Sequence, residues 1–124
     1  MPATVLVVDD EIHMRRLAAR ILELSGYNVL EAASGNEALS IVKKTPPDVI
    51  TCDISMPGMS GFEFLAAIKD LPSAANIPVI MLTALGQNKD ISRATALGAA
   101  AYISKPFSSA KLVETIQRQL DAPK

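Results

Sequence analysis

The sequence lacks the residues that nucleic acid binding usually requires. It contains no tryptophan, and aromatic residues make up 4% of its 124 residues, so few side chains are available for base stacking. Twelve lysines and arginines are matched by 13 aspartates and glutamates, and the net charge of −1 offers no electrostatic footprint for a phosphate backbone. This composition argues against direct nucleic acid binding by this chain.

Cysteines, long apolar runs and targeting segments are also scarce or missing. Cys52 is the single cysteine, which excludes an internal disulfide, and its position within an apolar run predicts a buried, reduced thiol. No apolar run approaches the roughly 20 residues of a transmembrane helix. The apolar run after Thr4 is too short for the core of a signal peptide. We therefore expect a cytoplasmic protein with no membrane segment and with its natural start at Met1.

What the sequence does contain is an alternation of short apolar runs and helical patterns, within a chain that is 49% hydrophobic. There are no repeats, low-complexity tracts or linkers, so we expect one domain over residues 1–124. Strands are predicted at 5–8, 27–31, 48–52, 79–83 and 101–104. Helices are predicted between Asp10 and Gly26, between Ser34 and Pro46, at 61–70, at 88–97 and after Ser108 or Ser109. Because the strands read as continuously apolar, the pattern predicts an α/β fold: a (βα)5 doubly wound, five-stranded parallel sheet with helices on both faces.

Local signals define several of these elements. The inner face of the first predicted helix is expected to consist of Met14, Leu17, Ala18, Ile21 and Leu22. The segment from Ser34 to Glu37 matches a capping box at the start of the second helix. Gly58 and Gly61 are expected to be flexible glycines of the loop after the third strand.

Four of the five predicted strands end in polar side chains. Asp9 and Asp10 follow the first strand, Asp53 the third, Thr83 the fourth and Lys105 the fifth. The run around residue 30 ends without an obvious chemical group. Each of these residues alone has a structural explanation, such as a helix cap, a strand end or a turn. Their joint occurrence predicts a site, because ligands of such sheets bind at the carboxyl ends of the strands.

Three converging carboxylates require a counter-charge. Two carboxylates about 5 Å apart repel by roughly 3 kcal/mol at an effective dielectric constant near 20. Hard oxygen ligands with open water positions suit Mg²⁺, or Mn²⁺ in its place. We expect Asp10 and Asp53 to bind the metal directly, a carbonyl near Ser55 to be a third ligand, and Asp9 to act through water.

Asp53 is the predicted nucleophile, since it stands apart from the acidic pair and is followed by a glycine-rich loop rather than by a helix. A carboxylate can attack phosphorus and form an aspartyl phosphate. Thr83 and Lys105 would then hold the other oxygens of the phosphoryl group.

These motifs together resemble the receiver domains of bacterial two-component response regulators. The resemblance covers essentially the whole chain, and it is carried by Val7 to Glu11, Asp53 with the Met56 to Gly61 segment, Thr83-Ala84 and Lys105-Pro106-Phe107. It implies that Asp53 accepts phosphate from a histidine kinase or a histidine phosphotransfer protein with Mg²⁺ bound. It also implies the flavodoxin-like strand order 2-1-3-4-5. Two positions differ from the common pattern: Ser60 stands where aspartate is usual, and Ala101 where aspartate or asparagine often precedes the tyrosine.

The resemblance also implies how phosphorylation becomes a signal. Thr83 would move toward the phosphoryl group and Tyr102 would turn into the vacated space, although the pattern alone reads Tyr102 as a half-buried strand aromatic. The expected output surface is the face formed by the fourth helix, fifth strand and fifth helix. Its charged residues would be Lys89, Asp90, Arg93, Lys111, Glu114 and Arg118, unless these simply form a solvated surface.

The last helix lacks the arginine-rich ending associated with receivers of winged-helix transcription factors. This favours a stand-alone receiver, or one attached to another type of effector, acting as a monomer or a phosphorylation-dependent dimer. Ser55 and Leu85, expected to flank the site, offer no carboxylate or amide to orient an attacking water, so we expect slow loss of phosphate. His13 is expected to be a solvated surface residue.

Three other functions remain as alternatives. A flavin- or nucleotide-binding module would need a phosphate cradle after the first strand, where this chain carries acids that repel phosphate. A phosphatase with an aspartyl-phosphate intermediate would need an acid two residues after the nucleophile, where this chain has Ser55. A receiver-like scaffold that works without phosphate would not need the complete acceptor set. We therefore expect a signalling domain rather than an enzyme with a separate substrate.

Overall fold

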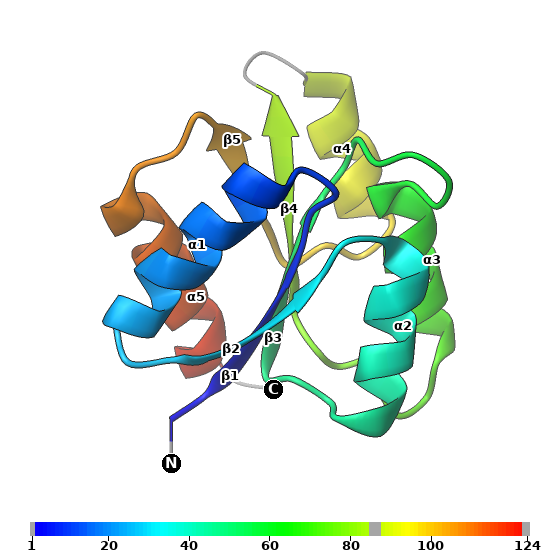
Figure 1. The fold of residues 1–124 in the computed structure, drawn as a ribbon. Helices are drawn as coiled ribbons and strands as arrows, with labels where there is room; N and C mark the ends of the chain where they lie inside the picture. Colours follow the sequence, from blue (N-terminus) through cyan, green and yellow to red (C-terminus); the bar gives the residue numbers. More distant parts are fainter. Residues whose placement is uncertain (1, 85–87, 123–124) are drawn as a thin grey trace.

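The computed structural model describes residues 2–84 and 88–122, and five strands alternate with five helices within them (Figure 1). The elements are β1 (Thr4–Val8), α1 (Ile12–Leu24), β2 (Asn28–Ala32), α2 (Gly35–Lys44), β3 (Val49–Asp53), α3 (Gly61–Asp70), β4 (Val79–Ala84), α4 (Asn88–Ala96), β5 (Ala101–Lys105) and α5 (Ser109–Asp121). All five predicted strands and helices are present, with bounds close to those expected. No strand end differs by more than one residue: β2 and β3 are shifted by one residue, and β1, β4 and β5 are each one residue longer than predicted.

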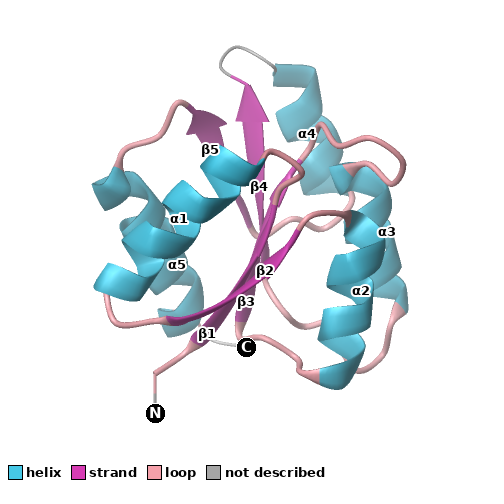
Figure 2. Ribbon diagram, viewed as in Figure 1, coloured by secondary structure: helices cyan, strands magenta, loops and turns pink. Residues whose placement is uncertain are grey.

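The strands form one parallel sheet in the order β2-β1-β3-β4-β5. Figure 2 shows α1 and α5 on one face of the sheet and α2, α3 and α4 on the other. This confirms the doubly wound α/β fold and the flavodoxin-like order. Because all five strands run the same way, their carboxyl ends lie along one edge of the sheet.

The core consists of two apolar layers, one on each face of the sheet. Alternate residues of β1 serve the two layers: Val5 and Val7 pack with α1 and α5, whereas Leu6 and Val8 pack with α2 and α3. All four side chains are fully buried. A central strand covered on both faces has no solvent side, which explains its continuously apolar sequence.

Serine caps fix where three helices begin. Ser108, rather than Ser109, caps α5, and the full capping box lies at Ser60 and Glu63 of α3. The capping box predicted for α2 is only half formed. Ser34 accepts from the backbone of Glu37, but the Glu37 carboxylate accepts from the amide of Ala33 instead of that of Ser34.

Two sequence predictions about local packing were wrong. Leu17 was expected on the inner face of α1, yet it is 51% exposed. Ala18, Ala19 and Leu22 are the buried residues of α1, so the helix presents smaller side chains to the sheet than predicted. Gly61 is not a flexible loop glycine; it is the first residue of α3, where the helix at 61–70 was predicted to begin. A Cβ at this position would collide with the backbone carbonyl oxygen of Asp53.

Other predictions were confirmed. Gly26 and Gly58 have positive φ angles of 97° and 73°, as expected for a helix stop and a turn. Cys52 is fully buried, and burial, together with the charges of Asp53 and Asp9, raises the pKa of its thiol. Within the described ranges, no helix combines the length and the apolar character needed to cross a membrane.

Candidate phosphoryl-acceptor site

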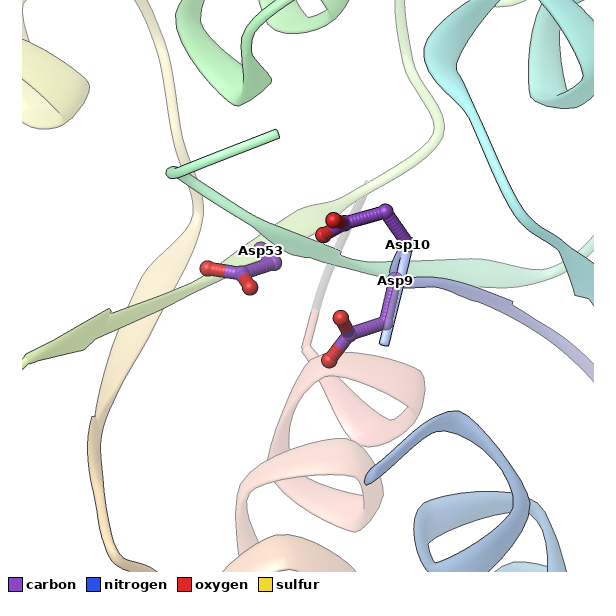
Figure 3. A group of neighbouring side chains, drawn as sticks. All are labelled: Asp9, Asp10 and Asp53. Atoms are coloured by element: carbon purple, nitrogen blue, oxygen red, sulfur yellow. The ribbon is translucent and has the colours of Figure 1, made fainter. Parts of the chain in front are cut away.

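Three carboxylates meet at the carboxyl edge of the sheet. Asp9 and Asp10 follow the end of β1, and Asp53 is the last residue of the neighbouring strand β3. One carboxylate oxygen from each residue lies within 4.8 Å of the others. In Figure 3, the side chains of Asp9 and Asp10 extend from β1 toward the side on which Asp53 lies. The structure therefore brings together the three acids that the strand ends predicted.

The three acids differ in their environment. Asp9 is 2% exposed, the Asp53 side chain is 13% exposed, and Asp10 is open to solvent. Burial raises the pKa of Asp9; the backbone amide of Glu11, 3.0 Å from Asp9 Oδ1, and the charge of Lys105 act in the opposite direction without cancelling this rise. Burial thus disfavours the ionised form of the Asp9 carboxyl.

Lys105 contributes a positive charge to the site. It is the last residue of β5, the edge strand of the sheet next to β4. Its ammonium lies 2.9 Å from Asp53 Oδ2 and 3.5 Å from Asp9 Oδ2. Burial by itself lowers the pKa of Lys105, but the hydrogen bond and charge of Asp53, with those of Asp9, outweigh it and the net shift is upward. The residue stays an ammonium near neutral pH and bridges two of the three acids.

The donor set fits a hard divalent cation. Three carboxylates and one ammonium leave a formal charge of −2, and every candidate ligand is an oxygen. Mg²⁺ and Mn²⁺ prefer oxygen ligands and retain bound water, which the exposed Asp10 side of the cluster leaves room for.

Asp53 is held by contacts on both of its carboxylate oxygens. Lys105 donates to Oδ2, and the backbone amide of Ser55 donates to Oδ1 at 3.2 Å. Gly61 closely approaches the backbone of Asp53 and Ile54, and its amide donates to the carbonyl of Ile54 at 2.9 Å. Ser55 thus contacts the site through its amide; binding of a metal by a carbonyl near it stays a prediction.

Thr83 lies on β4 and Tyr102 on β5, and no described hydrogen bond joins either side chain to the three acids. The Thr83 side chain is buried near the end of β4, and its hydroxyl donates to the carbonyl of Ala84 at 3.3 Å. Tyr102 is 48% exposed on β5. His13 is exposed, as expected. Leu85 lies outside the described residues, so the slow loss of phosphate stays a prediction.

Two residues at the site were not predicted from the sequence. Arg15 donates through Nη1 to the backbone carbonyl of Asp9 at 3.0 Å, and through Nε to Glu31 of β2 at 3.2 Å. A signal for Arg15 was present, because it precedes the buried Ala18 and Leu22 at helical spacing and so places a charge on an apolar face. Glu31 gave no such signal.

Comparison with known proteins places the chain in a family. The family described as "Response regulator receiver domain" matches residues 5–117. The chain is 38% identical over 120 residues to the polar-differentiation response regulator DivK of Brucella anthropi, covering 97% of this chain and 98% of DivK. It is 38% identical over 117 residues to the phosphate regulon transcriptional regulatory protein PhoB of Pseudomonas aeruginosa, covering 94% of this chain.

The lengths of these relatives differ. The chain spans about half of several transcriptional regulators that it matches, and 51% of PhoB. Among solved structures it is similar to the chemotaxis protein CheY4 of Vibrio cholerae, with a TM-score of 0.92, 38% identity, and coverage of 97% of this chain and 100% of that one. The chain therefore belongs to the response regulator receiver domains, the signalling domains of two-component systems.

Proposed function

We propose that this chain accepts a phosphoryl group on Asp53, from a histidine kinase or a histidine phosphotransfer protein, and that phosphorylation switches its binding to a partner. The observation that carries the proposal is the contact of Lys105 with Asp53 at 2.9 Å beside two further carboxylates. This arrangement supports the proposal, because a nucleophile, a cation-binding pair and a positive charge would then act within one small volume.

The acidic residues would also hold the metal. Mg²⁺ at an acidic pocket is general in this family. Asp10 and Asp53 would bind it directly, with a carbonyl near Ser55, and Asp9 would act through water. When bound, Mg²⁺, or Mn²⁺ in its place, would supply positive charge next to the oxygens of the transferring group.

The reaction would be the transfer of a phosphoryl group from a histidine nitrogen of the donor to a carboxylate oxygen of Asp53. A carboxylate oxygen of Asp53 forms the new bond to phosphorus while the bond to the donor imidazole nitrogen breaks, and the bonding electron pair stays on that nitrogen. The Lys105 ammonium donates a hydrogen bond to Asp53 Oδ2, so it would need to move only a short way to reach an oxygen of a phosphoryl group on Asp53. The amide of Ser55 holds the other carboxylate oxygen during the approach.

The switch would use Thr83 and Tyr102. Inverting a 1:99 population requires about 5.5 kcal/mol. Two new charged hydrogen bonds, at roughly 1.5–3 kcal/mol each, supply that amount only if Thr83 and Lys105 both engage the phosphoryl group. Thr83 would give up its bond to Ala84. Tyr102, now half exposed, would turn into the vacated space.

The output surface would be the face of α4, β5 and α5. Three of its six predicted charges have partners: Arg93 stacks over the ring of Phe62 of α3, 4.2 Å from its centroid, and Arg118 pairs with Glu114 at 2.7 Å. Lys89, Asp90 and Lys111 complete the charged set. We propose that this face binds a downstream protein or an attached effector domain, in the cytoplasm, and that the domain itself binds neither nucleic acid nor membrane.

Replacing the acceptor tests the chemistry. Incubation with radiolabelled acetyl phosphate or a phosphohistidine donor in Mg²⁺ should label the wild type, and the label should disappear when EDTA is present. Asp53→Asn should take up no label. Asp70→Asn, which removes the same charge at the exposed end of α3, should label like the wild type. Labelling of Asp53→Asn at the wild-type rate would contradict the assignment of the acceptor.

A further inference from the structure

We infer that Arg15 and Glu31 are positioning residues that hold the acidic turn after β1 in the shape needed to bind a divalent cation. The inference deepens the proposed function and rests on it. It concerns β2, whose carboxyl end carries no side chain of the acceptor site, and gives this strand a role in that site.

Both backbone groups of Asp9 are tied to β2. The Asp9 amide donates directly to the carbonyl of Ala32 at 3.1 Å. The Asp9 carbonyl accepts from Arg15 Nη1 at 3.0 Å, and the same guanidinium donates to Glu31 at 3.2 Å. Glu31 and Ala32 are consecutive residues, so one end of β2 fixes Asp9 from both sides.

The bond to the Asp9 carbonyl orients the peptide plane that joins the two acids. This carbonyl belongs to the peptide group between Asp9 and Asp10, which is planar, so fixing its oxygen also fixes the direction of the following amide. The course of the chain through Asp10 then depends on Arg15. Because the guanidinium is rigid and planar, it can hold the carbonyl and the Glu31 carboxylate together in a fixed geometry.

The position of the pair is unlike that of a surface ion pair. The Arg15 side chain is 13% exposed and that of Glu31 is 32% exposed. Arg16 offers the internal comparison: its Nε lies 3.4 Å from the same Glu31 oxygen, but its side chain is 69% exposed. The described hydrogen bonds join Arg15, and not Arg16, to the acidic turn.

Electrostatics and positioning predict opposite effects when Arg15 is removed. Arg15 places a positive charge beside a site that would bind a cation, so charge alone predicts tighter cation binding by Arg15→Ala. Positioning predicts weaker binding, since the Asp9–Asp10 peptide loses its anchor. Glu31 partly neutralises this charge, which allows an arginine to serve next to a cation site.

The test is the dissociation constant of Mn²⁺ for the whole chain, measured by electron paramagnetic resonance of free Mn²⁺ or by calorimetry. Arg15→Ala should raise the constant by about tenfold, the lower end of what loss of an outer-shell partner costs a metal site. Arg16→Ala, the matched control, should stay within about twofold of the wild type. Arg15→Lys keeps the positive charge but cannot donate to both acceptors in the planar geometry of a guanidinium. It should therefore bind Mn²⁺ more weakly than the wild type, as Arg15→Ala does.

A double-mutant cycle separates a joint action of the two residues from two independent effects. If Glu31 acts through Arg15, adding Glu31→Gln to Arg15→Ala should weaken Mn²⁺ binding no further. Circular dichroism of each metal-free variant shows whether it is folded. If Arg15→Ala does not fold, Arg15→Lys and Glu31→Gln carry the comparison.

The outcomes distinguish this inference from the proposed function. Failure of the wild type to bind Mn²⁺ or to take up label would overturn both. A wild type that binds and labels, together with folded Arg15→Ala and Arg15→Lys variants that bind Mn²⁺ as tightly or more tightly, would overturn the positioning role alone. Equal weakening by Arg16→Ala would also overturn it, because that residue does not contact the acidic turn in the described structure.

Discussion

The core of the sheet and its carboxyl edge follow opposite physical rules. Inside, the side chains from Val5 to Val8 are fully buried against helices on both faces, and nothing in this layer requires a ligand. At the edge, Asp9, Asp10 and Asp53 lie close together, and the ammonium of Lys105 contacts two of them. Two carboxylates about 5 Å apart repel by roughly 3 kcal/mol at an effective dielectric constant near 20. The core therefore stabilises the fold, whereas we expect the acidic edge to oppose folding until a cation binds. Truncating a core side chain should lower the free energy of unfolding, whereas cation binding at the edge should raise it by a smaller amount.

The largest expected effect is in the core. Phe64 of α3 is fully buried in the layer between α2, α3, α4 and the sheet. Phe64→Ala should lower the free energy of unfolding by about 3–5 kcal/mol, since it removes buried apolar surface and leaves a cavity. Urea denaturation followed by circular dichroism measures this change. The folded fraction should still be labelled at Asp53.

An exposed residue of similar character provides the comparison for the core. Leu24 of α1 is 71% exposed, so Leu24→Ala should change the free energy of unfolding by less than about 0.5 kcal/mol. A loss below about 1 kcal/mol for Phe64→Ala, or similar losses for the two variants, would show that burial does not determine stability here.

The next effect is at the edge and has the opposite sign. Adding Mg²⁺ at a hundred times its dissociation constant should raise the free energy of unfolding by about 2.7 kcal/mol, because the ion binds the folded state alone. Urea titrations with and without Mg²⁺ give this difference. Asp53→Asn should lose most of the gain. A full gain in that variant would place the ion elsewhere.

How much of this contrast could be predicted from the sequence differs between core and edge. The core was predictable because continuous apolar runs and helical spacing follow directly from burial, and the bounds of the strands differ by one residue at most. The rotation of α1 about its axis could not be predicted, because Leu17 and Ala19 both fit an apolar face. In the structure the smaller Ala19 is buried and Leu17 is exposed.

At the edge, the sequence predicted the convergence of the acids and Lys105, because parallel strands bring their carboxyl ends together. It did not predict what supports them. Arg15 and Glu31 are 16 residues apart and meet only through the packing of α1 against β2. The sequence pattern placed Gly61 at the start of a helix but indicated a flexible glycine, since its close approach to the backbone of Asp53 depends on the fold and not on local pattern.

Gly61 joins the two regions, and its replacement should affect both moderately. In Gly61→Ala the new methyl group would meet the Asp53 carbonyl and lie 2.7 Å from the Ile54 Cα. Backbone on both sides must shift, so we expect a loss of about 1–3 kcal/mol in the free energy of unfolding and slower labelling of Asp53. Urea denaturation and the labelling rate measure the two effects.

Gly58 provides the control for Gly61. It has open space around it but a φ of 73°, so Gly58→Ala should cost about 1–2 kcal/mol through backbone strain alone. Its labelling rate should stay near that of the wild type. If Gly58→Ala slows labelling as much as Gly61→Ala does, the contact with Asp53 is not what matters.

The smallest expected effect is a stabilisation obtained by removing a site residue. Burial holds the pKa of Asp9 above the 3.8 of an ordinary aspartate, and the charge of Asp53 adds to the rise, while Lys105 only partly offsets it. Between pH 3.8 and the higher pKa of the folded state, Asp9 is therefore protonated in the folded state but ionised in the unfolded state. As the pH rises from 3.8 through the folded pKa, the wild type loses stability relative to Asp9→Asn, which carries no such charge.

Without metal, the stability of Asp9→Asn should thus equal that of the wild type below pH 3.8 and exceed it near pH 7. Urea denaturation from pH 3 to pH 8 in EDTA measures this difference. Saturating Mg²⁺ should reverse the order near pH 7, since the wild type keeps the full acidic cluster and the variant does not. A variant that is less stable than the wild type at pH 7 without metal would mean that Lys105 already compensates Asp9, and that the edge does not oppose folding in the way the core comparison requires.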